Sequence, residues 1–339
     1  MAKTRLKVDE ASKESHMKEG LFTTGNAKDF ESTQQIRRNM IERSELPHCD
    51  TPLPDKKDFN YWSERFVKRQ EIVAETEPIK DHVEFTFPKS ICLNFIGDLH
   101  VGSPAVDYKR IQEEAAYIVN TPDSYVMMMG DMIDGFFFNP AQMSQMEQTP
   151  QQYEYMRELL KFYSKNNKLL IGWTGDHDNW SKKFGIGAYS DFSEFTNAHL
   201  MSGTGYATIN VGEQEYKITG SHRFPGSSIY NRNHPGKRSL IFGGSRGSDI
   251  VVSAHTHGKG YTADSLTGFG GKAEAVHIIN IGSYKWVDGY ARKLGLTPIA
   301  NGTSQMYGSA VILNSETKDI HYYDDILQAN KILTERYNE

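Results

Sequence analysis

The chain has 339 residues, of which 38% are hydrophobic, and carries a net charge of −5. This is enough for one large domain with an extension or for two domains. It contains no run of about 18 apolar residues, and its charged N-terminus lacks the apolar segment of a secretory signal, so we expect no membrane span and a cytoplasmic location. The two cysteines, Cys49 and Cys92, suggest no disulfide framework. The acidic net charge argues against broad nonspecific binding to DNA but leaves room for a local basic path.

Residues 1–88 differ in composition from the rest of the chain. They are highly charged with balanced sign, and apolar residues are few before Phe59. A weak helical pattern covers 29–43, a stronger one covers 59–74, and the prolines of 46–53 predict a linker between them. We expect a partly helical extension that folds onto the following domain or onto a partner subunit, and through which the chain forms a homo-oligomer.

From residue 89 to residue 325 we expect one domain, followed by a C-terminal tail at 326–339. Apolar runs bounded by turn residues predict strands at 91–96, 125–129, 168–174, 206–211, 216–219, 250–253, 275–281, 308–313 and 320–323. Helices are predicted at 108–119 and from Thr149, as the N-cap before Pro150, to about residue 163. This order predicts an α/β fold in which two mixed β-sheets pack together with helices outside, as a four-layer αββα sandwich.

Five short clusters of Asp and His each follow one of these apolar runs. They contain seven candidate ligands, namely Asp98, His100, Asp131, Asp176, His222, His255 and His257. In an open α/β sheet, ligands gather beyond the carboxyl ends of the strands, so these side chains are expected at one rim. A single cluster is equally well explained by a solvated loop carboxylate or a core histidine. Five clusters at the same position favour a functional site.

The donor types indicate a centre for two metal ions. Seven oxygen and nitrogen donors, with no thiolate among them, are more ligands than a four-coordinate zinc site uses. They suit two divalent ions roughly 3.5–4 Å apart. Imidazole and carboxylate do not distinguish the metals; we expect two divalent ions, with manganese first and iron, zinc, nickel or magnesium as alternatives.

The series of motifs resembles the signature of the calcineurin-like metallophosphoesterases. The blocks D-x-H, G-D-x-x-D, G-N-H-D/E, a lone H and G-H-x-H occur in that family's order, from about residue 90 to about residue 323. The resemblance implies the αββα sandwich, a catalytic domain at 89–325 and metal-dependent phosphoester hydrolysis. It implies a first metal on Asp98, His100 and His257, and a second on Asp176, His222 and His255. Asp131 would bridge the two, and His177 would be the unligated general acid.

Two further aspartates close to these motifs each have two alternative roles. Asp178 either orients His177 or caps the loop, and Asp134 is expected to hold a ligand in place or to close its turn. Two positions depart from the family pattern, because Asp176 stands where Asn is usual and Ala254 replaces the first Gly of the last block. A third ligand carboxylate would reduce the formal charge of the centre, so we expect tighter metal binding and a weaker pull on a phosphoryl oxygen.

Two further segments bear on the substrate. Gly135 stands where the family's protein phosphatases carry an Arg, and three phenylalanines follow at 136–138, as core residues or as a ledge on which bases stack. A basic insert then separates His222 from the last block, and it is either an exposed polar loop or a phosphate-binding loop. Its candidate substrate-binding residues are Arg223, Arg232, Lys237 and Arg238.

These features favour a phosphodiesterase acting on nucleic acid, such as DNA, or on nucleotides. The basic insert is similar to that of phage and bacterial phosphoesterases labelled as nucleases. One alternative is a phosphomonoesterase for a protein or small molecule. Another is a binding scaffold that keeps the fold without turnover.

Overall fold

A computed structural model describes residues 58–76, 81–136, 145–180, 192–226, 228, 230–267, 271, 273–287 and 306–337. The chain divides into two compact units, residues 1–73 and 74–339. In the first unit, helix α3 (Phe59–Thr76) confirms the helix predicted at 59–74. Asp58 caps it, since its carboxylate accepts a hydrogen bond from the Tyr61 amide at 2.9 Å. The helix predicted at 29–43 and the linker at 46–53 lie outside the described residues.

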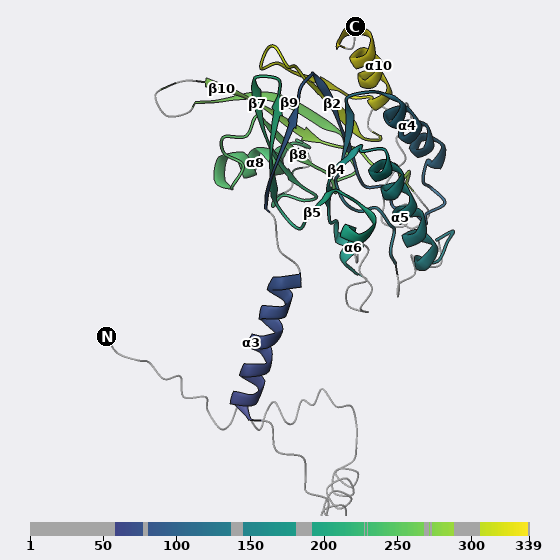
Figure 1. Ribbon diagram of the computed structural model, residues 1–339, viewed down its shortest axis with the longest axis vertical. Coiled ribbons are helices and arrows are strands. Elements are labelled where there is room, and N and C mark those ends of the chain that lie inside the picture. The colour runs from purple at the N-terminus through teal and green to yellow at the C-terminus, as the bar shows by residue number, and fades with distance from the viewer. Residues whose placement is uncertain are drawn as a thin grey trace, which may run out of the picture. The chain divides into compact units, whose positions relative to one another are not determined.

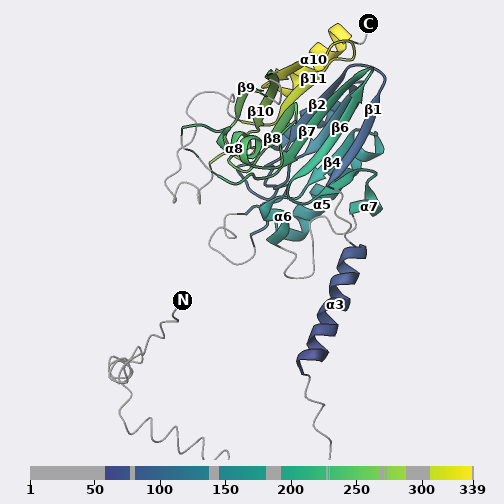
Figure 2. The same ribbon diagram turned by 90° about the vertical axis from the view of Figure 1, so that its left-hand side faces the viewer.

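The second unit is built on two mixed six-stranded sheets (Figures 1 and 2). In order across it, sheet A contains β1 (His82–Phe87), β6 (Gly205–Val211), β7 (Gln214–Ser221), β8 (Ile250–Ser253), β10 (Ala273–Asn280) and β9 (Gly260–Thr267). Sheet B contains β12 (Ile320–Tyr323), β11 (Ser309–Leu313), β2 (Ile91–Ile96), β3 (Ser124–Met128), β4 (Leu169–Trp173) and β5 (His199–Met201).

The second unit contains six helices among the described residues. They are α4 (Tyr108–Asn120), α5 (Thr149–Lys165), α6 (Asp176–Trp180), α7 (Phe192–Phe195), α8 (His234–Phe242) and α10 (Ile326–Tyr337). Helices α4, α5 and α10 pack against strands of sheet B, and α8 packs against β8 and β10 of sheet A. The expected αββα sandwich is therefore confirmed. No helix among the described residues is long and apolar enough to cross a bilayer.

Strand β2 contributes side chains to two separate hydrophobic cores, one on each face of sheet B. All six of its residues are buried, because a strand in the middle of such a sheet has an apolar layer on each face. Leu93 and Phe95 belong to the core between the sheets. Cys92 and Ile96 alternate with them and belong to the core under the helices.

The structure differs in several places from the expectations drawn from the sequence. Residues 326–337, expected as part of a tail, form α10, which buries Ile326, Ala329 and Leu333 against the core of sheet B. Strand β1, expected within the extension, pairs in parallel with β6. Helix α8 occupies part of the segment expected as a basic loop. The N-cap of α5 is Gln148 and not Thr149, so Thr149 and Pro150 are the first two residues of the helix.

Candidate metal centre

The candidate ligands follow strands of both sheets. In sheet B, the parallel strands β2, β3 and β4 lead into Asp98, Asp131 and Asp176, respectively. In sheet A, the parallel strands β7 and β8 lead into His222 and His255. The backbone amide of His255 donates to the Asp98 carboxylate at 2.8 Å, so a ligand loop of one sheet is joined to a ligand of the other.

The backbone at most of these positions is in the left-handed region, which side-chain-bearing residues seldom adopt. Eight described non-glycine residues have a positive φ, and five of them are candidate ligands: Asp98, His100, Asp131, His255 and His257, with φ of 48–70°. Backbone hydrogen bonds hold this geometry, including those from the Asp98 amide to the Gly130 carbonyl at 2.9 Å and from the His100 amide to the Asp131 carbonyl at 3.1 Å. Such clustering of strained backbone is typical of functional sites.

The glycine at position 175, in the third motif, is required for a steric reason. A Cβ at this position would lie 2.1 Å from both the amide nitrogen and a carboxylate oxygen of Asp131. Only glycine lets the loop after β4 approach the loop after β3 this closely. The close approach lets the His177 amide donate to the Asp131 carboxylate at 2.8 Å.

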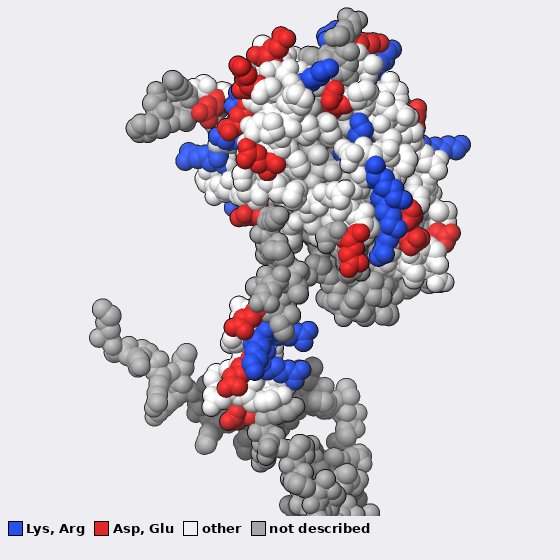
Figure 3. Space-filling model, viewed as in Figure 1, with Lys and Arg blue, Asp and Glu red and all other residues white. Residues whose placement is uncertain are grey.

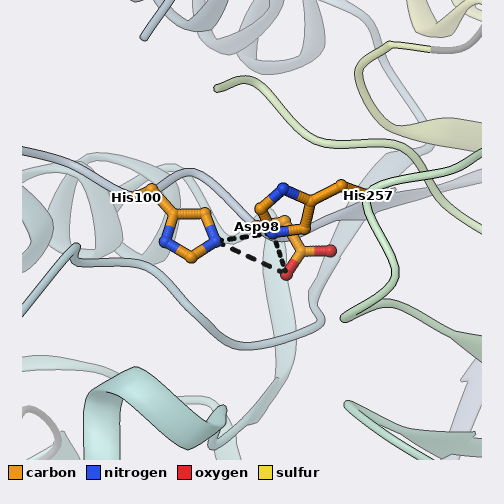
Figure 4. Close-up of side chains that lie close together, drawn as sticks. All are labelled: Asp98, His100 and His257. Carbon is orange, nitrogen blue, oxygen red and sulfur yellow. Dashed lines mark hydrogen bonds and ion pairs between the residues drawn. The ribbon is translucent and has the colours of Figure 1, made fainter. Parts of the chain in front are cut away.

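The first group of ligands consists of Asp98, His100 and His257, whose side chains point toward one another (Figure 4). Their facing atoms are Asp98 Oδ1 and the two Nε2 nitrogens. Asp98 Oδ1 lies 3.9 Å from His100 Nε2 and 3.8 Å from His257 Nε2, and the two nitrogens are 2.8 Å apart. Two imidazole nitrogens and a carboxylate oxygen thus face one small space.

The second group consists of Asp131, His222 and His255. His222 donates from Nδ1 to the Met129 carbonyl at 2.8 Å, which aims its Nε2 at Asp131 Oδ2, 3.1 Å away. The same Asp131 oxygen lies 4.0 Å from His100 Nε2 of the first group. Asp131 therefore stands between the two groups. Asp176 lies at their open side, with its carboxylate 3.4 Å from His255 Nδ1.

The residues present fit a pair of cations. Buried side-chain atoms without a hydrogen-bond partner include Asp98 Oδ1 and His255 Nδ1, and buried polar atoms are nearly always paired. Burial raises the pKa of Asp98 to about 8. For His222, burial lowers the pKa, but the hydrogen bond to the Asp131 carboxylate outweighs it and raises the value to about 10. A proton on His222 thus compensates the buried carboxylates, and a bound cation would replace it.

His177 is held by contacts outside the two groups. Its Nδ1 lies 2.7 Å from the Asp134 carbonyl, which can only accept, so the proton is on Nδ1 and Nε2 is left for other partners. The orienting role considered for Asp178 thus falls to the Asp134 carbonyl. The Asp178 carboxylate instead accepts from the amides of Met132 at 3.0 Å and Gly175 at 2.9 Å, and so closes the loops.

Asp134 contacts the candidate ligand His100, in agreement with the expectation that it holds a ligand in place. Its Oδ1 lies 3.3 Å from His100 Nδ1 and 2.8 Å from Lys285 Nζ. His100, Asp134 and His177 also form a third group with metal-ligand spacing, but the ammonium of Lys285 already compensates this carboxylate.

Sequence analysis missed Lys285 and Trp180. Lys285 follows β10, far along the chain from Asp134, and carries no local signal. Trp180 stacks on the His177 ring, with centroids 3.9 Å apart and an interplanar angle of 29°. The spacing of three residues between His177 and Trp180 predicts that they share a face if the segment is helical, and this signal was available.

The candidate substrate-binding residues are dispersed. Arg223 lies beside the centre, with its guanidinium 3.7 Å from the Asp176 carboxylate, and lines a cavity of about 200 Å³ together with Phe224, Ala254 and His255. Lys237, on α8, forms an ion pair with Asp264 of β9 at 2.6 Å, so its charge is compensated there.

The other two basic residues pack against glycines. If Gly258 carried a Cβ atom, that atom would lie 2.8 Å from the guanidinium carbon of Arg232. A Cβ atom on Gly226 would likewise lie 3.0 Å from Cδ of Arg238. Of the expected aromatic ledge, Phe136 contacts His177 and Trp180, while Phe137 and Phe138 lie outside the described residues.

Neither a protein-family model nor a curated protein matches the chain. Among solved structures, it is similar to Vps29 complexed with Zn²⁺ from Entamoeba histolytica at 12% identity and a TM-score of 0.32, over 68% of this chain and 97% of that one. It is similar to the calcineurin-like phosphoesterase YfkN from Bacillus subtilis at 10% identity and a TM-score of 0.33, over 73% and 96%. The nuclease MPE from Pseudomonas putida matches at 10% identity and a TM-score of 0.28, over 68% and 86%. Similarities of this size carry no argument about activity, so the proposal below depends on the site itself.

Proposed function

We propose that the protein is a calcineurin-like metallophosphoesterase that hydrolyses phosphodiesters of nucleic acid or nucleotides with the help of two divalent metal ions. The observation that carries this proposal is the meeting of two Asp/His groups at Asp131, with buried donor atoms that lack partners. The order of the sequence motifs supports it independently.

Each ligand has a place in this proposal. Asp98, His100 and His257 would hold one ion, Asp176, His222 and His255 would hold the other, and Asp131 would contact both. When bound, such ions lower the pKa of water to about 7 and neutralise charge on phosphate oxygens. Manganese is the metal we expect first.

His177 supplies the proton in this mechanism. In the doubly protonated imidazolium, Nδ1 would donate to the Asp134 carbonyl, and the proton on Nε2 would pass to the leaving oxygen as hydroxide derived from water bonds to phosphorus and the phosphorus–oxygen bond breaks. The Asp134 carbonyl also stabilises the charged imidazolium before the transfer. Asp178 keeps the two loops together, so that His177 and Asp131 retain their hydrogen bond at 2.8 Å.

Recognition surfaces on two sides favour a diester over a monoester. The cavity lined by Arg223 borders His255 of the second group, whereas Phe136 and Trp180 border His177, which contacts His100 of the first group. A diester has a substituent on each side of its phosphorus, and a monoester has only one. On the face drawn in Figure 3, acidic and basic side chains of the described residues are interspersed.

A panel of esters tests this function. Metal-loaded protein is assayed with bis-p-nitrophenyl phosphate, p-nitrophenyl phosphate, single- and double-stranded DNA and cyclic nucleotides, with Asp131→Asn as the inactive control. We expect faster cleavage of the diesters, abolished by EDTA and by the substitution. Faster cleavage of the monoester would support the phosphomonoesterase, and metal binding without any turnover would support the scaffold.

A further inference from the structure

Phe136 and Trp180 form an aromatic group beside His177, here called the aromatic platform. Trp180 ends α6 and stacks on the imidazole at 3.9 Å. Phe136, from the loop after β3, meets the imidazole edge-on at 5.3 Å and the indole at 5.3 Å with an angle of 46°. Lys285 Nζ lies 5.8 Å from the Phe136 ring centroid, so a cation supports this ring.

Core packing does not explain the position of Trp180. Its side chain is 39% exposed, whereas Trp173 of β4 is fully buried between the sheets. Burial of a large aromatic ring is among the strongest contributions a side chain makes to stability. An indole left half in solvent and stacked on one imidazole is therefore better placed for a ligand than for the core.

We propose that the aromatic platform binds a nucleobase on the leaving group of the ester, so that the departing product is a nucleoside or nucleotide. This inference rests on the proposed function, because it takes His177 as the donor to the leaving oxygen. The leaving group must then lie next to His177, and Trp180 is the exposed side chain stacked on that ring. A planar base adds a stacking contact that a sugar or an alkyl group does not make.

Product binding tests the platform without turnover. Isothermal titration of the metal-loaded protein compares adenosine 5′-monophosphate with ribose 5-phosphate, which has the same phosphate and sugar but no base. We expect the nucleotide to bind about 5- to 100-fold more tightly. Trp180→Leu should remove most of this difference while leaving the affinity for ribose 5-phosphate within about twofold, and Trp180→Phe should retain part of it. Phe162→Leu, at an aromatic side chain of α5 that is 43% exposed and outside the platform, should change neither affinity.

The outcomes separate the platform from the proposed function. Equal affinities for the two ligands in the wild type, or equal losses for both ligands in Trp180→Leu, would overturn the platform and leave Trp180 as a support for His177. Diester hydrolysis with equal affinities would leave the proposed function intact and remove the platform alone. Base-dependent binding without turnover of any ester would overturn the proposed function. A further titration with a dinucleotide and a single-stranded oligonucleotide shows whether the base belongs to a mononucleotide or to a strand, since only a strand gains affinity with length.

Discussion

The metal centre has a recessed half and an open half. Asp98, His100, Asp131 and His222 are each at most 4% exposed. In contrast, the side chains of Asp176, His257 and His255 are 49%, 39% and 32% exposed. The recessed candidate ligands follow strand ends and are held by hydrogen bonds to neighbouring loops, whereas His255 of the open half lines the cavity beside Arg223. If the proposed function is right, we expect the recessed half to contribute most to metal retention and the open half to meet the substrate.

The two departures from the family pattern, Asp176 and Ala254, both lie in or beside the open half. Arg223 lies there as well, within ion-pair distance of Asp176. Changes in the recessed half should therefore have the larger effect on metal content, whereas changes in the open half should have the larger effect on affinity for the substrate and on the rate of turnover.

The largest effect is expected for Asp131→Asn in the recessed half. Loss of the carboxylate between the two groups should remove most of both metals and lower turnover on the order of 10⁴-fold or more. Elemental analysis of the purified variant, with circular dichroism to check its fold, provides the measurement. Two retained ions per chain would refute the assignment of Asp131 as the bridge.

His177→Ala separates proton transfer from metal retention. We expect unchanged metal content and a turnover lower by roughly 10²–10⁴-fold. Esters with good leaving groups need little protonation, so bis-p-nitrophenyl phosphate should lose less activity than a dinucleotide. A variant that loses its metals together with its activity would make His177 a ligand.

Arg223→Ala tests the open half. Because Arg223 lines the cavity beside His255, its loss should raise KM for a nucleotide diester by about 5- to 20-fold, as expected for a lost charge-assisted contact. Lys237→Ala is the matched control, since the Lys237 ammonium is already paired with Asp264. Equal changes in the two variants would indicate a general effect of positive charge and not a contact at the cavity.

Asp176→Asn should produce a smaller change with opposite signs in two quantities. Removing an exposed carboxylate weakens metal binding at the open side by about 3- to 10-fold. At saturating metal, the more positive centre should raise turnover by a few-fold at most. Metal titrations followed by kinetics at saturation measure both quantities, and tighter binding in the variant would contradict the expected electrostatics.

The smallest effect concerns a buried carboxyl outside the centre. Burial raises the pKa of Glu114 on α4 to about 7, although Arg110 and Tyr284 are hydrogen-bonded to it. The folded state thus binds this proton more tightly than the unfolded state, so stability from this group is complete below about pH 4.5 and is lost as the pH rises toward 7. Compared with Glu114→Gln, the wild type should lose about 3 °C or more in Tm across this interval. Parallel Tm curves for the two proteins would rule the effect out.

Several strands, and the motifs that follow some of them, could be predicted from the sequence. The bounds of β2, β8 and β12 agree with the expected ranges, because short apolar runs between turn residues leave few alternatives. The edge strand β9 was missed because its sequence is polar and its one neighbour in the sheet is β10. Helix α10 was missed because the sequence alone did not show that its apolar residues pack against sheet B. In the structure, Ile326, Ala329 and Leu333 belong to that core.

The surroundings of the candidate ligands were harder to predict because their contacts join distant parts of the chain. The pairing of Lys285 with Asp134 spans 151 residues, and no local pattern indicates it. The partner of Lys237 on β9 depends on a strand that the sequence did not reveal. Residue types at strand ends therefore predicted which side chains the structure brings together as candidate ligands, while the contacts around those side chains could be read only from the folded chain.

The left-handed backbone of five candidate ligands also limits which mutations the fold can accept. At Asp98 and Asp131, with φ of 48° and 50°, glycine, asparagine and aspartate are tolerated, whereas a β-branched residue would strain the backbone whatever its effect on metal binding. Asp176 begins helix α6 and is free of this restriction. In a library of all single substitutions selected for folding and not for activity, we therefore expect few residue types to be accepted at positions 98 and 131 and many to be accepted at position 176. The position at which this chain departs from the family's asparagine is thus one where the backbone permits variation.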